Sequence, residues 1–278
     1  GYGILLDSNS NSNNVTLNTI TTVSGFGLYL LLNSNSNTLT SNVITTSGTD
    51  GHGIALSSSP NFNIFTSNNV TTTGNAAAGI FLTTTSDSNT FISNTINTTH
   101  SNQSYGIKIL SANQTIFRNN TITTNGVESI HDTSDSSTTN ELIYSNSFGE
   151  INWSKTNLTT NISSLGIGTN IFVQNNLLGL VDDSNALNLN SSATLTFYGL
   201  TGWGPNNPSV LKNGATCSSP NCNVTSWSSG AGTLVASVAS FSNYSAQDGG
   251  GAAVPEFSDY AIILILIVTI GGFLVMKK

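Results

Sequence analysis

The residues of this chain that could carry out acid–base chemistry are few and widely spaced. Inverting hydrolysis of a glycosidic bond needs one carboxyl group as the acid and a second one to activate water. Upstream of His52 the sequence offers only Asp7 and Asp50, and the adjacent pair Asp182-Asp183 falls in a different part of the chain. This spacing argues against a complete hydrolytic site within the sequence.

Two short segments nevertheless resemble catalytic motifs. Asp50-Gly51-His52-Gly53 resembles the Gly-His-Gly of polygalacturonases, and Tyr105-Gly106-Ile107-Lys108 is loosely similar to their Arg-Ile-Lys, with Gly106 in the place of the Arg. Pectate lyases need calcium bound by Asp residues and an Arg base, whereas the sole arginine, Arg118, has no acidic cluster in register. We therefore interpret the glycines as turn residues before a strand and predict no catalytic residue.

Metal and cofactor sites are not predicted either. The histidines His52, His100 and His131 do not share a position in the repeat described next, so they cannot form a column of ligands.

A repeat of about 26 residues organises the first half of the chain. An Asn recurs with gaps of 24, 26, 26, 26 and 26 residues, at Asn18, Asn42, Asn68, Asn94, Asn120 and Asn146. Apolar residues lie three before and two after each Asn, and each unit also contains an apolar-x-apolar triplet after a small residue. The alternation has period 2, which predicts short strands. Each unit is therefore predicted to be one coil of a β-solenoid, in which stacked Asn amides satisfy one another.

The repeat pattern over residues 1–149 resembles the parallel β-helix repeats of NosD-like and pectate-lyase-like proteins. The resemblance implies a right-handed parallel β-helix, here of about six coils. It does not define a function, because such helices carry lyases, hydrolases, adhesins and plain stalks.

The middle residue of each triplet is predicted to face outward. Among these residues, Tyr29 and Phe81 have rings that could stack on sugars, and Lys108 is a third candidate carbohydrate contact. The alternative is that residues 97–104 or a C-terminal module cover the rings. The sixth triplet, Ser129-Ile130-His131, is shifted slightly in phase.

The second half of the chain changes character after residue 165. Strand-like runs at 170–174, 177–181, 193–198, 210–212 and 234–241 are separated by Gly, Pro and Asn, which predicts a small antiparallel β-sandwich. The segment resembles a membrane-proximal β module of archaeal surface proteins. Cys217 and Cys222 are the only cysteines, and Pro220-Asn221 can form the turn that lets them pair. A metal site is the alternative, but two thiols without a nearby His are too few for structural zinc.

The C-terminal segment predicts an anchor. Residues 260–276 are 17 residues without a charge, which is close to the lower limit for a bilayer span, although a buried core segment is the alternative. Lys277-Lys278 should lie on the cytoplasmic side. Upstream, a Gly-rich spacer precedes Pro255, Glu256 and Phe257. This order is similar to the PEF-type sorting signal of archaeal surface proteins, and the resemblance implies cleavage by an archaeosortase-type processing enzyme.

Glycosylation is predicted from Asn-x-Ser/Thr sequons, with chance occurrence in an Asn-rich chain as the alternative. The sequons lie at Asn14, Asn69, Asn97, Asn102, Asn113, Asn119, Asn152, Asn157, Asn161, Asn190, Asn223 and Asn243.

These observations predict an all-β chain in five parts. They are a parallel β-helix over residues 1–150, a connector over 151–165, a β-sandwich over 166–246, a spacer with the PEF motif over 247–257, and a transmembrane helix with its basic tail over 258–278. Because Gly1 already lies inside a repeat, we expect further coils before it.

The predicted function is that of a non-catalytic, extracellular stalk or adhesin-like protein, anchored to the cell membrane by its C-terminus, which binds polysaccharide or cell-envelope glycans along the β-helix. The alternative is a polysaccharide lyase or glycoside hydrolase whose catalytic coils lie upstream of Gly1. A net charge of -7 with only six basic residues argues against nucleic acid as a partner.

Overall fold

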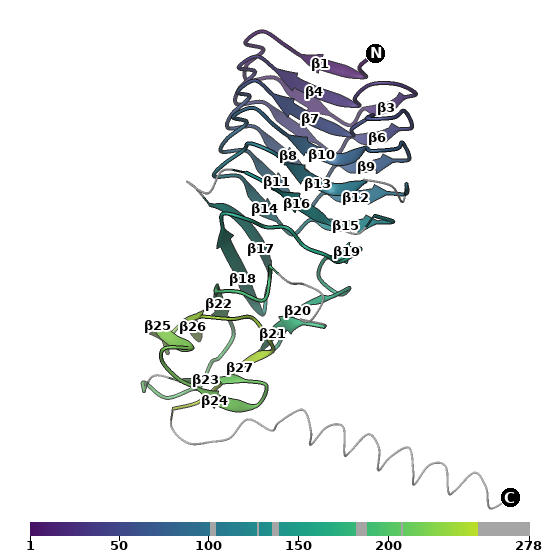
Figure 1. Ribbon diagram of the computed structural model, residues 1–278. Coiled ribbons are helices and arrows are strands. Elements are labelled where there is room, and N and C mark those ends of the chain that lie inside the picture. Colours follow the sequence, from purple (N-terminus) through teal and green to yellow (C-terminus); the bar gives the residue numbers. More distant parts are fainter. Residues whose placement is uncertain (101–103, 127, 135–138, 182–187, 207, 250–278) are drawn as a thin grey trace, which may run out of the picture.

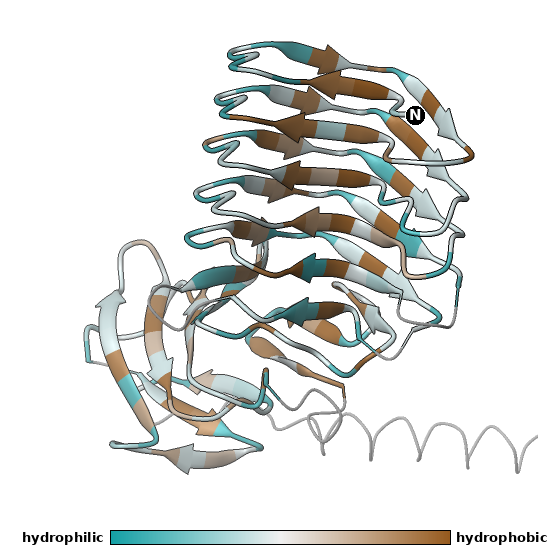
Figure 2. Cartoon of the chain, turned by 45° about the horizontal axis from the view of Figure 1, so that its top comes forward, coloured by the Kyte–Doolittle hydropathy of each residue, from teal (hydrophilic) through white to brown (hydrophobic). Residues whose placement is uncertain are grey.

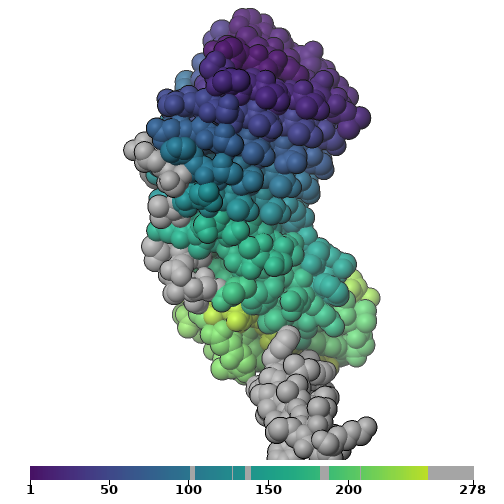
Figure 3. All heavy atoms as spheres, turned by 90° about the vertical axis from the view of Figure 1, so that its right-hand side faces the viewer, coloured from purple at the N-terminus to yellow at the C-terminus, as the bar shows by residue number. Residues whose placement is uncertain are grey.

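A computed structural model describes residues 1–249 apart from 101–103, 127, 135–138, 182–187 and 207. The described residues form β-strands and no helix, so the prediction of an all-β chain is confirmed. The strands of the first half stack as coils in chain order, and a second group of strands lies at the C-terminal end of the stack (Figure 1). Figure 3 shows the same order on the surface, where each coil contacts its neighbours in sequence.

Each coil contributes one strand to each of three parallel sheets. Sheet A contains β1 (Ile4–Leu6), β4 (Leu28–Leu31), β7 (Ile54–Ser57), β10 (Ala78–Leu82), β13 (Tyr105–Ile109) and β16 (Ile130–Asp132). Sheet B begins with β2 (Asn14–Thr16), β5 (Thr38–Thr40), β8 (Ile64–Thr66), β11 (Thr90–Ile92) and β14 (Ile116–Arg118). Sheet C contains β3 (Thr19–Thr22), β6 (Val43–Thr46), β9 (Asn69–Thr72), β12 (Thr95–Thr98) and β15 (Thr121–Thr124).

The inward residues of the coils form one continuous apolar core. In every sheet, residues at the same position of the repeat pair with one another, as Phe65, Phe91 and Phe117 do along sheet B. These three rings are fully buried and stacked, with centroids 4.5 and 5.3 Å apart. Most outward positions of sheet C carry Thr or Asn, so hydropathy alternates along these strands, whereas the outward column of sheet A includes Leu5, Tyr29, Ala55 and Phe81. Figure 2 shows the alternation of apolar and polar residues along many of the strands. The period-2 pattern of the sequence is therefore the alternation between core and surface.

The stack has five complete three-stranded coils, one fewer than the predicted six. In the sixth repeat, β17 (Asn140–Asn146) still pairs in parallel with β14, but it then forms an antiparallel hairpin with β18 (Gly149–Lys155). After β17 the chain therefore stays in sheet B and does not turn into sheet C. Instead, β19 (Ser164–Leu165) pairs antiparallel with β15 and covers the end of that sheet.

The hairpin also removes Asn146 from the predicted Asn ladder. Asn146 is exposed, its side-chain nitrogen donates to the carbonyl of Val173, and its Oδ1 accepts the N–H of Phe148 in the hairpin turn. Its spacing of 26 residues from Asn120 continues the sequence pattern without continuing the coil. The sixth triplet is likewise corrected by one residue: Ile130, His131 and Asp132 pair with the triplet of β13.

The expected boundary at residue 150 lies inside a sheet. Sheet B continues from β17 and β18 into β22 (Ala193–Phe197), β26 (Thr233–Val238) and β25 (Cys222–Ser228), giving ten strands. A separate five-stranded antiparallel sheet contains β20 (Ile171–Gln174), β21 (Leu177–Leu180), β27 (Tyr244–Gln247), β23 (Ser209–Lys212) and β24 (Ala215–Cys217). The buried side chains Trp153, Phe197, Phe241 and Tyr244 belong to the same apolar cluster as the solenoid core, so the two parts share their packing.

One column of glycines allows the coils to close. The glycines recur just before the triplets of the first five sheet A strands, at Gly3, Gly27, Gly53, Gly79 and Gly106, and Ser129 holds this place before β16. A Cβ atom at any of these glycines would lie within 2.1–2.3 Å of an inward β-branched side chain of sheet C and within 2.6–2.8 Å of a carbonyl oxygen in the next coil. Only a hydrogen atom fits there, and this explains the small residue before each triplet.

We predict that Gly79→Ala lowers the free energy of unfolding by about 1–3 kcal/mol, because the added methyl group would overlap Ile96. Gly230→Ala is the matched control, since nothing lies within 4 Å of its Cβ position, and it should change stability by less than about 0.5 kcal/mol. Urea denaturation measures both values. Equal stability of the two variants would contradict the close packing of the glycine column.

Candidate functional site

The bend between sheets B and C is held by the Asn ladder. The side-chain Oδ1 of Asn68 accepts the backbone and side-chain N–H groups of Asn42 at 3.0 and 2.9 Å. Its Nδ2 donates to the carbonyl of Leu39 in one neighbouring coil and to Oδ1 of Asn94 in the other, at 2.9 and 3.0 Å. Asn94 repeats these bonds with Asn120, and Asn18 opens the series by donating to Asn42. Tyr144 closes it by donating from its hydroxyl to the carbonyl of Asn120 at 2.9 Å.

These bonds offset backbone strain at the bend. The residue before each ladder Asn has a left-handed backbone, with φ between 53° and 59° at Leu17, Ser41, Ser67, Ser93 and Asn119. That conformation costs a residue other than glycine about 1–2 kcal/mol. The amide side chain of the following Asn forms hydrogen bonds with both neighbouring coils, as at Asn68, and these bonds hold the chain in this conformation.

A second Asn ladder, which the sequence reasoning missed, holds the bend between sheets A and B. The backbone N–H of Asn37 donates to Oδ1 of Asn63 at 2.8 Å, and that of Asn63 donates to Oδ1 of Asn89 at 2.9 Å. Thr115 interrupts the column, and Asn140 resumes it by accepting the N–H of Thr115. The spacing of 26 residues was visible in the sequence, but neighbouring Ser and Asn residues in the same turns obscured it.

We predict that Asn68→Thr lowers the free energy of unfolding by about 1–3 kcal/mol, because it leaves the buried backbone N–H of Asn42 and the carbonyl of Leu39 without partners. Asn69→Thr applies the same substitution to the next residue, whose side chain is exposed beside Thr95, and should change stability by less than about 0.5 kcal/mol. Thermal denaturation followed by circular dichroism compares them. A neutral Asn68→Thr would show that the ladder does not stabilise the coil.

An almost continuous stripe of rings runs along the outer face of sheet A. It comprises Tyr2, Phe26, Tyr29, His52, Phe81, Tyr105 and His131, and we call it the aromatic stripe. Neighbouring ring centroids lie 4.3–5.7 Å apart from Tyr2 through Phe26 and His52 to Phe81. The ammonium group of Lys108 then bridges two rings, 5.7 Å from the centroid of Phe81 and 5.4 Å from that of Tyr105. Tyr105 stacks on His131 at 4.6 Å.

The stripe arises from two columns of the repeat. Tyr29, Phe81 and Lys108 were predicted from the middle of the triplet, and the structure places them in one register column with Ala55 and His131. The second column, at the residue before each glycine, was missed; it contains Tyr2, Phe26, His52, Ala78 and Tyr105. The aromatic-Gly dipeptide in four of these five coils was the signal that could have found it.

Apart from His52, which is buried, the side chains of the stripe remain partly open to solvent. Phe26, Tyr29, Phe81, Lys108 and His131 are half-buried, and Tyr2 is 51% exposed. Burial raises the pKa of both Tyr29 and Tyr105, so their hydroxyl groups stay protonated as hydrogen-bond donors. The stripe therefore presents ring faces and edges, phenolic hydroxyls and one ammonium group to a ligand.

His52 belongs to this stripe as a neutral ring. It lies between Phe26 and Phe81, and its Nδ1 accepts the backbone N–H of Ala78 at 2.9 Å, which places the proton on Nε2. Burial lowers its pKa to about 4, the positive charge of Lys108 acts in the same direction, and Asp50 opposes them. The Gly-His-Gly segment is thus explained by the repeat: two glycines flank an aromatic position.

We predict that His52 makes the protein less stable as the pH falls from 6.5 to 4. In this range the unfolded chain takes up a proton at His52 and the folded chain does not, so about 3 kcal/mol of unfolding free energy is lost by pH 4, and none is lost above pH 6.5. His52→Phe should reduce the slope of stability against pH, as measured by urea denaturation. At pH 8 His52 is neutral in both the folded and the unfolded chain, so the difference in unfolding free energy between the two proteins at that pH comes from packing alone. An unchanged slope would contradict the prediction.

Neither of the two ion pairs found among the described residues includes His52. Arg118 forms an ion pair with Glu150 at 2.8 Å on sheet B, and Nδ1 of His131 contacts Glu128 Oε2 at 2.5 Å at one end of the stripe. Within the described residues, no group of three or more His, Cys, Asp or Glu side chains could hold a metal ion. The pair Asp182-Asp183 lies outside the described residues.

The remaining predicted sites lie away from the stripe. Cys217 and Cys222 form a disulfide with a Cα–Cα distance of 5.5 Å. None of the sequon asparagines within the described residues lies in a strand of sheet A. The asparagine is exposed in seven of them, at Asn14, Asn69, Asn157, Asn161, Asn190, Asn223 and Asn243. It is half-buried at Asn97, Asn113, Asn119 and Asn152, and Asn102 lies outside the described residues.

The predicted anchor segment does not belong to the described part of the chain. Pro255, Glu256, Phe257 and the apolar run 260–276 lie outside the described residues. In the described part of the chain, no helix has the length and apolar character needed to cross a membrane.

A comparison with protein families supports the fold. A family model described as the right-handed β-helix region matches residues 1–96. Together with the stacked coils, the match shows that this is a parallel β-helix repeat protein with a right-handed solenoid. No curated protein and no solved structure matches the chain. Because β-helices of this kind occur in adhesin-like and in polysaccharide-active proteins, the function has to be argued from the surface.

Proposed function

We propose that this chain is a non-catalytic cell-surface protein that binds a polysaccharide along the aromatic stripe. The observation that carries the proposal is the alignment of seven rings and one ammonium group on a single face of the rod. Aromatic faces pack against the apolar faces of sugar rings, and phenol and ammonium groups can bond sugar hydroxyls.

The dimensions of the stripe suit an extended ligand. It spans the strands from β1 to β16, and five intervals of about 4.8 Å between adjacent strands give roughly 24 Å. A polymer of sugar residues laid along the rod axis could contact Tyr29, Phe81 and Lys108 in turn. A small-molecule site is a concave cleft or pocket, whereas an open row of rings suits a chain.

The cell-surface location rests on the sequence. The apolar run 260–276 would span the membrane, and Pro255-Glu256-Phe257 would direct an archaeosortase-type enzyme to exchange the helix for a lipid. The antiparallel strands over residues 166–246 would then form a sandwich-like base next to the membrane, with the β-helix projecting outward. Glycans on the exposed sequons would lie away from the stripe, which leaves sheet A open.

We predict that Phe81→Ala weakens polysaccharide binding about fivefold or more, because one ring stacked on a sugar contributes about 1 kcal/mol and the substitution also removes a ring that positions the ammonium group of Lys108. Phe62→Ala is the control, since Phe62 is 63% exposed in a turn outside the stripe. Binding is measured by affinity electrophoresis in gels that contain plant, algal or archaeal envelope polysaccharides. Equal retardation of both variants and the wild type would contradict binding at the stripe.

One observation favours the alternative, an enzyme that cleaves polysaccharide. Glu128 and His131 form an acid–base pair at the end of the stripe, and Tyr105 stacks on His131. A lyase would need such a base beside a cation like Lys108. Incubation of the protein with the polysaccharide that it binds separates the two functions: a stalk leaves the chain length unchanged, whereas a lyase or hydrolase shortens it.

A further inference from the structure

An open pocket lies beside the disulfide, on the part of the chain farthest from the first coils. Its volume is about 400 Å³, and its polar lining consists of Lys212, Thr216, Ser218, Ser219, Asn221 and Ser240. These residues come from β23, β24, the loop that the disulfide closes, and the segment after β26. The pocket is separate from the aromatic stripe, which lies on sheet A.

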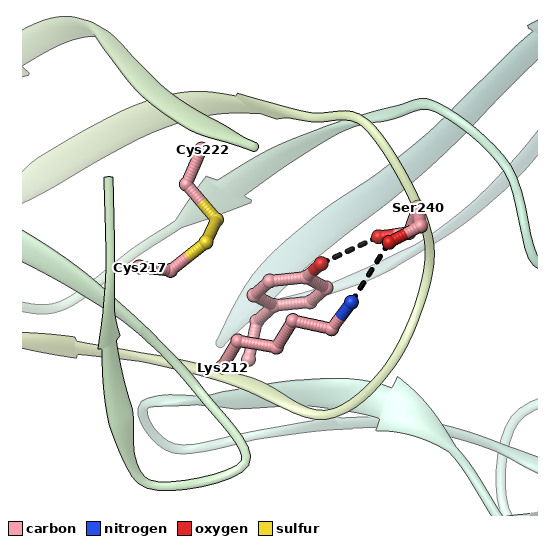
Figure 4. Close-up of a disulfide and its surroundings, with 5 residues drawn as sticks. Lys212, Cys217, Cys222 and Ser240 are labelled. Carbon is pink, nitrogen blue, oxygen red and sulfur yellow. Dashed lines mark hydrogen bonds between the residues drawn. A yellow bond between two sulfur atoms is a disulfide. The ribbon is translucent and has the colours of Figure 1, made fainter. Parts of the chain in front are cut away.

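The charge in this pocket comes from Lys212. Its Nζ donates to the hydroxyl of Ser240 at 2.7 Å and lies 6.0 Å from the ring centroid of Tyr244 (Figure 4). An ammonium group has three donors, so two remain for a ligand. Among the described residues, no carboxylate lies within ion-pair distance of Lys212. The pocket therefore presents a positive charge that the described part of the protein does not neutralise.

The opposite wall of the pocket is held in place. The disulfide joins β24 to β25, and the backbone N–H groups of Asn221 and Cys222 both donate to the carbonyl of Ser218 at 3.0 and 3.1 Å. Ser218, Ser219 and Asn221 are exposed. Their hydroxyl and amide groups, held by this small loop, can both donate and accept hydrogen bonds.

We propose that this pocket binds a sugar residue that carries an anionic group, either a carboxylate or a sulfate. The anionic group would pair with the ammonium of Lys212, and the sugar hydroxyls would bond to the side chains of Ser218, Ser219 and Asn221. The fixed donors and acceptors opposite the charge favour a polyol with an acidic group over a bare inorganic anion. A pocket of this volume falls in the size range of small-molecule sites.

The proposal is tested by titrating the ¹⁵N-labelled protein with glucuronic acid, glucose 6-sulfate, glucose and inorganic sulfate in separate NMR experiments. Both acidic sugars should shift the amide signals of residues 215–219, 221, 222 and 240, and the shifts should weaken as salt is added. Glucose and inorganic sulfate should bind at least tenfold more weakly. Glucose binding as tightly as glucuronic acid, or inorganic sulfate binding as tightly as glucose 6-sulfate, would overturn the proposal.

Two substitutions assign the effect to the ammonium group. Lys212→Gln should weaken binding of glucuronic acid at least tenfold, and Lys212→Arg should restore most of it because the positive charge returns. Lys155→Gln is the matched control, because the ammonium of Lys155 contacts a backbone carbonyl, that of Asn188, outside the pocket. Wild-type affinity in a folded Lys212→Gln protein would refute the site. Polysaccharide binding at the stripe is measured with Phe81→Ala, so the two proposals can fail independently.

Discussion

The structure depends on keeping identical positions in register from one coil to the next. Strand pairing supplies most of the hydrogen bonds between coils, but the chain must also bend sharply between sheets, and each bend before the Asn ladder places a residue in the left-handed region. Asn68 and its equivalents occupy the following position and bond to the coils on both sides. A slip of one residue would turn every inward side chain outward. The ladders and the glycine column therefore fix a register that the short strands alone would specify weakly.

Register in the core also determines what the surface presents. Because Leu28, Ile80 and Ile107 stack inward, the residues that follow them stack outward, and the column of Tyr29, Phe81 and Lys108 results. A second outward column precedes the glycines, and the rings of the two columns meet. A surface of this kind needs no loop to shape it, since the repeat itself aligns the rings. The same rigidity makes the stripe a pre-organised surface that would lose little conformational entropy when it binds a ligand.

The repeat could be predicted from the sequence because the apolar residue at each inward position recurs about every 26 residues. Only one of the two outward columns could be predicted, the one that contains Tyr29 and Phe81. Phe26 and His52 lie outside the triplets, and they contact the rings of the first column only in the folded coil. The end of the solenoid could not be predicted, because Asn146 keeps the spacing although its backbone turns into a hairpin. The pocket at Lys212 was also invisible, since it joins residues almost 30 positions apart in a region without a repeat.

The most direct test of this account is a crystal structure of the protein with an oligosaccharide from a polysaccharide that it binds. The account predicts sugar density along the rod axis on the outer face of sheet A, with ring faces packed against Tyr29 and Phe81 and a hydroxyl or acidic group near Lys108. Sugar density on sheet B or sheet C, with the aromatic stripe bare, would contradict it.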